Sequence, residues 1–230
     1  MPPNPSLHPK CYSGLRPPAR SGELKRSVAF RSMRLNKARE ILLEHLPDAN
    51  LRPQTHDEWH GPFALPGAVL AYYGEVGPID LEIETYGNPW YIPKLAELWR
   101  LQAGYRYHPE TNKRFEDWSD DWLVVAYEGG DPYIFDVRTE TILYDYHGRG
   151  VWEPKPIFKN LAEMIFVFAV LGGIGMRARP DLTDEDGYIL AANYAAAQVS
   201  LERILTEKGA ALAILSTLGW EQQPNSPHAP

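Results

Sequence analysis

Residues 118–150 constrain the fold more than any other part of the chain, because they hold three strand-like segments separated by turn sequences. The segments are residues 123–126, 133–137 and 141–144, all rich in β-branched and aromatic residues. The first turn is Gly-Gly-Asp-Pro at 129–132. Successive glycines adopt positive φ readily, and Pro132 opens the next strand, where a missing N–H costs least. The pattern predicts a three-stranded antiparallel meander.

Hydrophobic patterns on both sides of the meander predict the remaining elements. Residues 79–86 alternate apolar with acidic side chains, which indicates a half-buried strand, and residues 90–92 form a short partner strand. Helices are predicted at 35–46, 66–73, 93–102, 160–171, 183–208 and 210–218. Asn160 is the expected N-cap of its helix, and the glycine pair 172–173 its expected end.

The expected fold class is therefore α+β: a mixed, mainly antiparallel sheet of about five strands with helices packed on one face, plus an α-helical C-terminal extension. The folded domain is expected over residues 33–172, with appended helices packed on it over 173–220 and a frayed tail at 221–230. The loop 104–116 is long for a compact domain, and loops of that length often have a function.

Residues 1–32 are rich in Pro, Ser and Arg without apolar periodicity, which predicts a disordered basic arm. Three interpretations are open for this arm: contact with nucleic acid, a mitochondrial presequence, and an extension with no role. The last is favoured, because Met33 directly precedes the first convincing helix.

Cysteine content and hydropathy indicate in which cellular compartment the protein is expected. Cys11 is the only cysteine, which excludes an intramolecular disulfide and a multi-cysteine zinc site and agrees with a reducing compartment. The chain shows no apolar run near eighteen residues and no signal-peptide core, so we expect no membrane span and a cytoplasmic location.

Familiar catalytic and metal-binding motifs are missing from the sequence. It contains no phosphate-binding glycine loop, no GxSxG elbow and no HExxH helix. His56 and His60 lie among acids, but Pro53 and Pro62 bracket them as a loop, so we expect a solvated segment with Trp59 on the core. No metal and no cofactor are expected.

The best catalytic candidates are the acids and the histidine of the meander, namely Asp131, Asp136, Asp145 and His147. Strand alternation sends neighbouring side chains to opposite faces, and Asp131 lies in a turn, so these four are not expected to converge. A nucleophile in an activated setting is also missing. We therefore expect a protein that is not an enzyme.

Charge is distributed unevenly along the chain. The net charge is −7, yet residues 1–39 carry nine Lys or Arg and one acid. Residues 116–145 carry nine acids and one base, Arg138, interleaved with aromatic residues. Such a surface repels nucleic acid and attracts basic partners, and Tyr and Trp are preferred at protein interfaces.

A family resemblance falls on the same stretch. The matching residues are Trp118, Trp122, Leu123, Val125, Ala126, Gly129, Gly130, Asp131, Tyr133, Asp136, Tyr144, His147 and Gly148, together with Leu65-Pro66 and Tyr72-Tyr73-Gly74 upstream and the helix 160–171 downstream. This pattern, over about residues 47–172, resembles the SUKH superfamily of yeast cell-wall regulators and bacterial immunity proteins. The resemblance implies a binding module, in bacteria commonly a cytoplasmic antitoxin that blocks the active site of a secreted toxin.

The resulting hypothesis is an immunity protein that binds a cognate toxin of a polymorphic toxin system, expected to be a basic protein acting on nucleic acid. The predicted partner-binding residues are Trp90, Tyr91, Trp118, Asp120, Asp121, Glu128, Asp131, Tyr133, Tyr146 and His147. A regulatory scaffold of the cell-wall-signalling type is the alternative, and a hydrolase using the meander Asp and His residues is the third. We expect a monomer that binds neither membrane nor nucleic acid.

Overall fold

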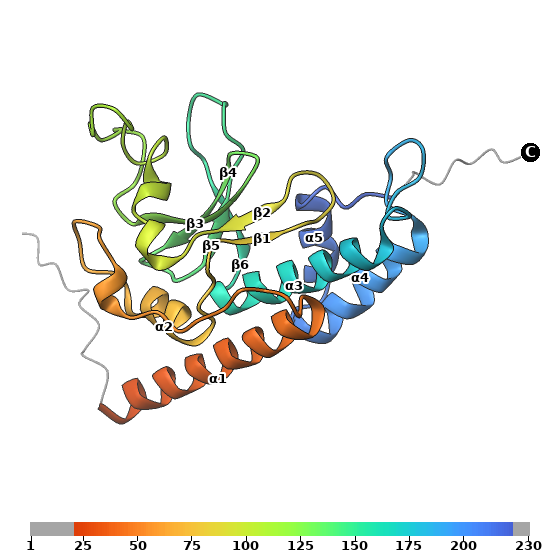
Figure 1. Ribbon diagram of the computed structural model, residues 1–230, viewed down its shortest axis with the longest axis horizontal. Helices are drawn as coiled ribbons and strands as arrows, with labels where there is room; N and C mark the ends of the chain where they lie inside the picture. The colour runs from red at the N-terminus through yellow and green to blue at the C-terminus, as the bar shows by residue number, and fades with distance from the viewer. Residues whose placement is uncertain (1–20, 223–230) are drawn as a thin grey trace, which may run out of the picture.

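The computed structural model describes residues 21–222, which form one antiparallel sheet, five α-helices and three short 3₁₀ helices (Figure 1). The strands are β1 (Leu81–Ile83), β2 (Trp90–Ile92), β3 (Trp122–Glu128), β4 (Asp131–Asp136), β5 (Ile142–Tyr144) and β6 (Lys155–Phe158). The helices are α1 (Ser21–His45), α2 (Gly67–Glu75), α3 (Leu161–Ala178), α4 (Ala191–Ile204) and α5 (Ala210–Thr217), with η1 (His56–Glu58), η2 (Leu95–Glu97) and η3 (Arg100–Gln102). The α+β class is confirmed.

The sheet is an up-and-down meander in the order β1-β2-β3-β4-β5-β6, and every neighbouring pair is antiparallel. The predicted three-stranded meander is confirmed as β3, β4 and β5. The sheet, expected to be mixed but mainly antiparallel with about five strands, has six strands and is antiparallel throughout. The sixth strand, β6, contains Pro156, and a proline in a sequence argues against predicting a strand there. It is tolerated because β6 is an edge strand, where one missing N–H costs no ladder hydrogen bond.

The two faces of the sheet are covered differently. Strand side chains such as Trp90, Leu123 and Phe135 belong to the main core, which the helices complete. In Figure 1, α3 lies against the sheet and α1 lies outside α3, so the helices cover one face, as expected. The outer face carries Val124, Ile134 and Leu143. Instead of helices, the loop between η3 and β3 covers them, with Trp118 as its buried centre.

Helix α1 begins earlier than predicted. Residues 21–32 were assigned to a disordered arm but are helical, whereas residues 1–20 of that arm lie outside the described residues. No proline interrupts residues 21–45, and the helix is tied to the domain near its start. Arg31 forms an ion pair with Glu140 at 2.7 Å, and the Ser32 hydroxyl donates to Glu75 at 2.8 Å.

Helix α3 confirms the predicted N-cap but not the predicted end. The Asn160 side chain accepts a hydrogen bond from the Glu163 amide at 3.0 Å. The helix then continues through Gly172 and Gly173 to Ala178. These glycines do not stop the helix; they permit close packing, because a Cβ at Gly172 would lie 2.3 Å from Ile83 and one at Gly173 would lie 2.8 Å from His45.

The full length of α3 corrects the expectation about apolar runs. With eighteen residues and a mean hydropathy of 1.7, α3 is long and apolar enough to cross a membrane by composition alone. However, 83% of it is buried inside the protein. Among the described residues, α3 is the one helix that passes this test, and it does so as the central core helix of a folded domain.

Two other predicted helices differ from the structure. Residues 93–102 form the two 3₁₀ helices η2 and η3 rather than one α-helix. The helix predicted from residue 183 begins only at Ala191, because the Asp184 carboxylate accepts from the amides of Asp186 and Tyr188 and closes a turn. The short helix α5 agrees with its prediction. Of the predicted tail, residues 223–230 lie outside the described residues.

The histidine-rich loop before α2 behaves as expected. Trp59 is buried against the core, and its indole N–H donates to the Phe63 carbonyl at 2.7 Å. His56 and His60 are exposed.

Candidate functional site

Three turns lie together at one end of the sheet, because alternate turns of an up-and-down meander fall at the same end. We call this the hairpin end; it comprises residues 87–89, 129–130 and 145–154. Gly129 and Gly130 have φ of 56° and 105°, a two-residue hairpin turn that requires glycine. A Cβ on Gly129 would lie 2.4 Å from Asn88, and one on Gly130 would lie 3.3 Å from His147. The three turns are therefore packed against one another.

Glu128 ends β3 at the hairpin end and faces inward. Its Oε2 accepts from the Trp90 indole N–H at 2.8 Å and from the Tyr133 hydroxyl at 3.1 Å. Trp90 in turn stacks on Phe168 of α3, with ring centroids 4.2 Å apart. Burial raises the pKa of the Glu128 carboxyl, and the charge of Asp131 adds to this, while the two hydrogen bonds lower it. Glu128 thus anchors the end of the core instead of presenting a free charge.

Asp131 and His147 come together at the same place, although they were expected not to converge. Asp131 Oδ1 accepts from the His147 backbone amide at 2.7 Å and lies 2.6 Å from the His147 Nδ1. The Tyr144 hydroxyl donates to Asp131 Oδ2 at 3.4 Å. The carboxylate therefore fixes the start of the β5–β6 loop against the β3–β4 turn.

Asp136 and Asp145 take no part in this pair. Asp136 is buried at the opposite end of β4, where Oδ1 accepts from the Arg138 amide at 2.8 Å and shapes the β4–β5 turn. Asp145 is buried as well, and its two oxygens accept from the amides of Tyr146 at 2.9 Å and Glu153 at 2.7 Å. Asp145 thus holds both ends of the β5–β6 loop. Both carboxylates are structural.

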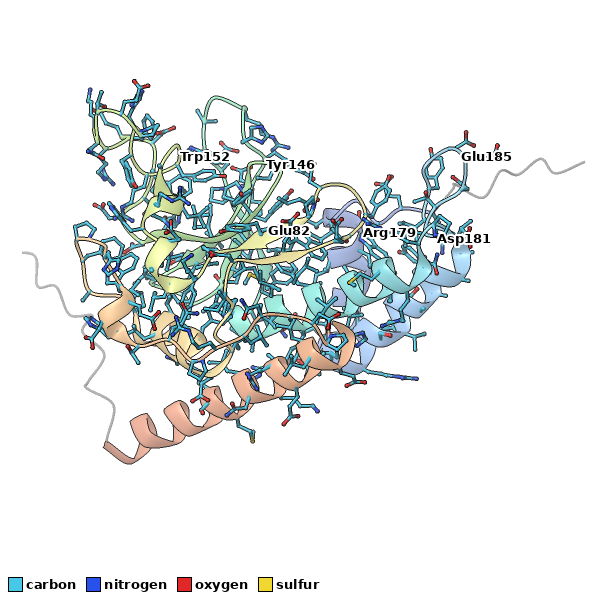
Figure 2. The ribbon with its side chains drawn as sticks, in the orientation of Figure 1. Glu82, Tyr146, Trp152, Arg179, Asp181 and Glu185 are labelled. Atoms are coloured by element: carbon cyan, nitrogen blue, oxygen red, sulfur yellow. The ribbon has the colours of Figure 1, made fainter. Side chains whose placement is uncertain are left out.

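The β5–β6 loop presents exposed apolar surface on this braced base. Tyr146 is 44% exposed and Val151 is 60% exposed. The Arg149 guanidinium lies over the Tyr146 ring, 4.7 Å from its centroid. Figure 2 shows Tyr146 and the half-buried Trp152 on the same side of the molecule. A hollow of about 230 Å³ runs between this loop and Asp117.

The remaining predicted acids lie elsewhere. Asp121 is at the other end of β3, where its carbonyl accepts from the Val137 amide at 2.8 Å. Its neighbour Asp120 is exposed but ion-paired, with Arg106 at 3.2 Å and Arg114 at 2.9 Å. The seven residues of β3 separate this end from Glu128 by about 20 Å. The acidic stretch 116–145 is thus divided between two ends of the sheet and does not form one patch.

Burial removes three further predicted partner-binding residues from the surface. Trp90, Trp118 and Tyr133 are at most 1% exposed, so none is available to a partner in this conformation. Tyr91 remains on the surface of the outer face, where it pairs across the strands with Tyr127, with ring centroids 5.3 Å apart. With Tyr105 they line a groove of about 360 Å³, which we call the tyrosine groove.

Of the ten predicted residues, the structure thus places Glu128, Asp131, Tyr146 and His147 at the hairpin end. Trp90 and Tyr133 are buried beneath Glu128 at the same end. Arg149 and Val151 belong to the same surface but were not predicted, because a glycine-rich loop gives no periodic signal. Their sequence, Arg-Gly-Val-Trp at 149–152, does contain the Arg and Trp that interfaces favour. Within residues 21–222 no group of three or more His, Cys, Asp or Glu side chains is arranged to hold a metal ion.

In comparisons with protein-family models, with curated proteins and with solved structures, nothing matches the chain.

Proposed function

We propose that the protein is a binding protein of the immunity type, which acts in the cytoplasm by occupying a cognate toxin stoichiometrically. The observation that carries the proposal is the exposed β5–β6 loop, where Tyr146, Arg149 and Val151 lie on a base fixed by the buried carboxylate of Asp145. Tyr, Trp and Arg dominate binding energy at interfaces, and a rigid loop loses little entropy on binding. The α+β fold is compatible with the SUKH resemblance.

Fewer acids are available to attract a basic partner than the sequence suggested. Glu128, Asp131 and Asp120 are engaged by hydrogen bonds or ion pairs within the chain. Glu116 and Asp117 are exposed, and Asp117 borders the hollow beside Tyr146. These two acids are therefore the ones that we expect to attract a basic partner and to raise its association rate.

The first experiment identifies the partner and then tests the loop. The full chain is purified from its native cells, co-purifying proteins are identified by mass spectrometry, and the affinity for each candidate is measured by calorimetry. Val151→Asp is expected to weaken binding at least about 30-fold, because it would bury an unpaired carboxylate in the interface. Val199→Asp is the matched control, because Val199 is exposed on α4 and does not line the hollow at the loop. Equal affinities of both variants would remove the loop from the interface.

A charge pair tests the partner's basic character. Glu116→Lys with Asp117→Lys is expected to slow association and to flatten its salt dependence, since steering acts mainly on the association rate. The matched control is Glu185→Lys with Asp186→Lys, on an exposed loop that Figure 2 shows away from Tyr146 and Trp152. If both pairs slow association equally, only net charge matters and the proposed surface is wrong.

One observation favours a second candidate function, that of a hydrolase. Asp131 lies 2.6 Å from Nδ1 of His147, whose side chain is 59% exposed, and a carboxylate in this position orients an imidazole for proton transfer through Nε2. The substrate would be attacked by water that His147 activates. A panel of activated esters and phosphodiesters tests this: turnover that disappears in His147→Asn would establish the hydrolase, and no turnover by the purified chain would reject it.

A further inference from the structure

The tyrosine groove is a second concave surface, separate from the β5–β6 loop. It lies on the outer face of the sheet between η2, η3 and the end of β3, with a volume of about 360 Å³. Its lining residues are Tyr91, Pro93, Glu97, Arg100, Leu101, Ala103, Tyr105, Tyr127 and Gly130. Nothing in the proposed function uses this groove.

Three tyrosines line the groove, namely Tyr91, Tyr105 and Tyr127. The Tyr91 hydroxyl donates to Asp80 at 3.0 Å, and the Tyr105 hydroxyl donates to the Gly130 carbonyl at 2.7 Å. These bonds fix the two rings, while Tyr127 packs beside Tyr91 at 46° to its plane. A groove of fixed aromatic faces is the surface that proline-rich peptides bind, because proline rings stack on the faces and the extended backbone is already ordered.

The chain itself contains such a sequence. Residues 1–20, which lie outside the described residues, contain six prolines, Lys10, Arg16 and Arg20, and no acid. Pro2-Pro3-Asn4-Pro5 has the PxxP spacing. In the groove, Glu97 forms an ion pair with Arg100, which also lines it, so the aromatic rings and not charge would select the peptide.

The prolines form two clusters, at residues 2–5 and 17–18, and the distance from Ser21 to the groove decides which of them can reach it. From Ser21 along α1 to Arg31 is about 15 Å, and Arg31 is bound to Glu140 at the end of the sheet away from the groove. The path from Ser21 to the groove also includes about 20 Å along β3 and about 10 Å across the sheet, so it is about 45 Å long. At about 3.1 Å per residue in an extended chain, residues 2–5 could reach about 50 Å from Ser21, whereas residues 17–18 could reach only about 12 Å.

We propose that residues 2–5 of the chain bind the tyrosine groove of the same molecule. The groove is then a peptide-binding site for proline-rich sequences, and the N-terminal segment is its resident ligand. This proposal is independent of toxin binding, because it needs no partner.

Cys11 makes the test direct, since it is the only cysteine and lies six residues after Pro5. A nitroxide attached to Cys11 of the full chain broadens the NMR signals of amides close to it. The expected result is broadening at Tyr91, Ala103 and Tyr127. Absence of broadening there, or broadening elsewhere only, would overturn the proposal.

Two matched pairs of variants decide whether the contact is the one proposed. Pro2→Ser with Pro5→Ser should abolish the broadening, whereas Pro17→Ser with Pro18→Ser should leave it. On the groove side, Tyr127→Ser should abolish it and Tyr188→Ser, on the loop before α4, should leave it. The reverse pattern in either pair overturns the proposal. A mixture of isotope-labelled chains without nitroxide and unlabelled chains with nitroxide is measured as well. Broadening in this mixture would also overturn the proposal, because the peptide would then come from a second copy.

Discussion

Gly172 is a position where shape requires glycine, and its replacement by alanine tests the packing of α3 on the sheet. A Cβ at Gly172 would lie 2.3 Å from Cγ2 of Ile83 and 3.4 Å from the Glu84 carbonyl oxygen. Ile83 is 1% exposed on β1, and its β-branched side chain has little freedom to rotate away. Either α3 or β1 must therefore move to admit the methyl group.

The size of the effect follows from two opposing contributions. Alanine in a helix interior is more favourable than glycine by about 1 kcal/mol. Overpacking a buried contact costs about 1–3 kcal/mol, and a carbon–carbon separation far below the usual contact of about 3.5 Å puts Gly172→Ala at the upper end. The expected net result is a loss of about 1–2 kcal/mol in the free energy of unfolding. At Gly175 the nearest atoms are 3.6 Å from the added Cβ, so Gly175→Ala should stabilise by up to about 1 kcal/mol.

Urea unfolding followed by circular dichroism measures both free energies on the full chain. Ile83→Ala removes Cγ2 and should cost about 2–5 kcal/mol by itself. In that background Gly172→Ala should be neutral or stabilising, because the clash has gone and the methyl group fills part of the cavity. Contact with Ile83 does not limit residue 172 if Gly172→Ala and Gly175→Ala shift stability in the same direction, or if Ile83→Ala leaves the cost of Gly172→Ala unchanged.

Three shorter predictions concern other contacts. Burial raises the pKa of the Glu128 carboxyl above its ordinary 4.5, so the ionised carboxylate destabilises the folded protein at pH values above this raised pKa. The destabilisation fades as the pH falls and the carboxylate is protonated. Glu128→Gln should therefore raise the thermal midpoint at pH 7 and lose that advantage below pH of about 4.5. Asn160→Ala removes the cap on the Glu163 amide and should cost about 1 kcal/mol in chemical unfolding. The fully buried Gln102 side chain forms hydrogen bonds with both the N–H and the carbonyl of Val124. Gln102→Leu should therefore lower the free energy of unfolding by at least about 2 kcal/mol. Equal stability of the variant would show that these two hydrogen bonds are dispensable.

The sequence predicted correctly those parts of the fold in which one or two residues determine the local backbone conformation. The glycine pair at 129–130 gave the β3–β4 hairpin, since both residues adopt positive φ. Asn160 gave the start of α3 through its side-chain cap. The end of the same helix was predicted wrongly, because Gly172 and Gly173 serve contacts with β1 and α1 that no local sequence window contains.

A β-bulge explains why the role of Glu128 was missed. Strict alternation from the inward-facing Leu123 would turn Tyr127 inward and Glu128 outward. The register of β3 shifts between Val124 and Ala126, which puts one additional residue into the strand and reverses the alternation after it. Tyr127 therefore faces the tyrosine groove, and Glu128 reaches the core indole of Trp90. Nothing in the apolar run 123–126 shows where such a bulge falls.

The division of the acidic stretch, in contrast, was implied by the predicted meander. Successive turns of an antiparallel meander fall at opposite ends of the sheet, so acids flanking the β3–β4 turn cannot share a surface with acids flanking the β4–β5 turn. Asp131 and Glu140 are nine positions apart in sequence but lie at opposite ends of β4, whereas Asp131 and His147, sixteen apart, are in contact. The acids that are close in sequence therefore belong to two ends of the sheet, and only those at the hairpin end lie near the proposed partner surface. The β5–β6 loop belongs with Asp131 for that reason, which makes Val151, and not Asp120, the residue that tests binding.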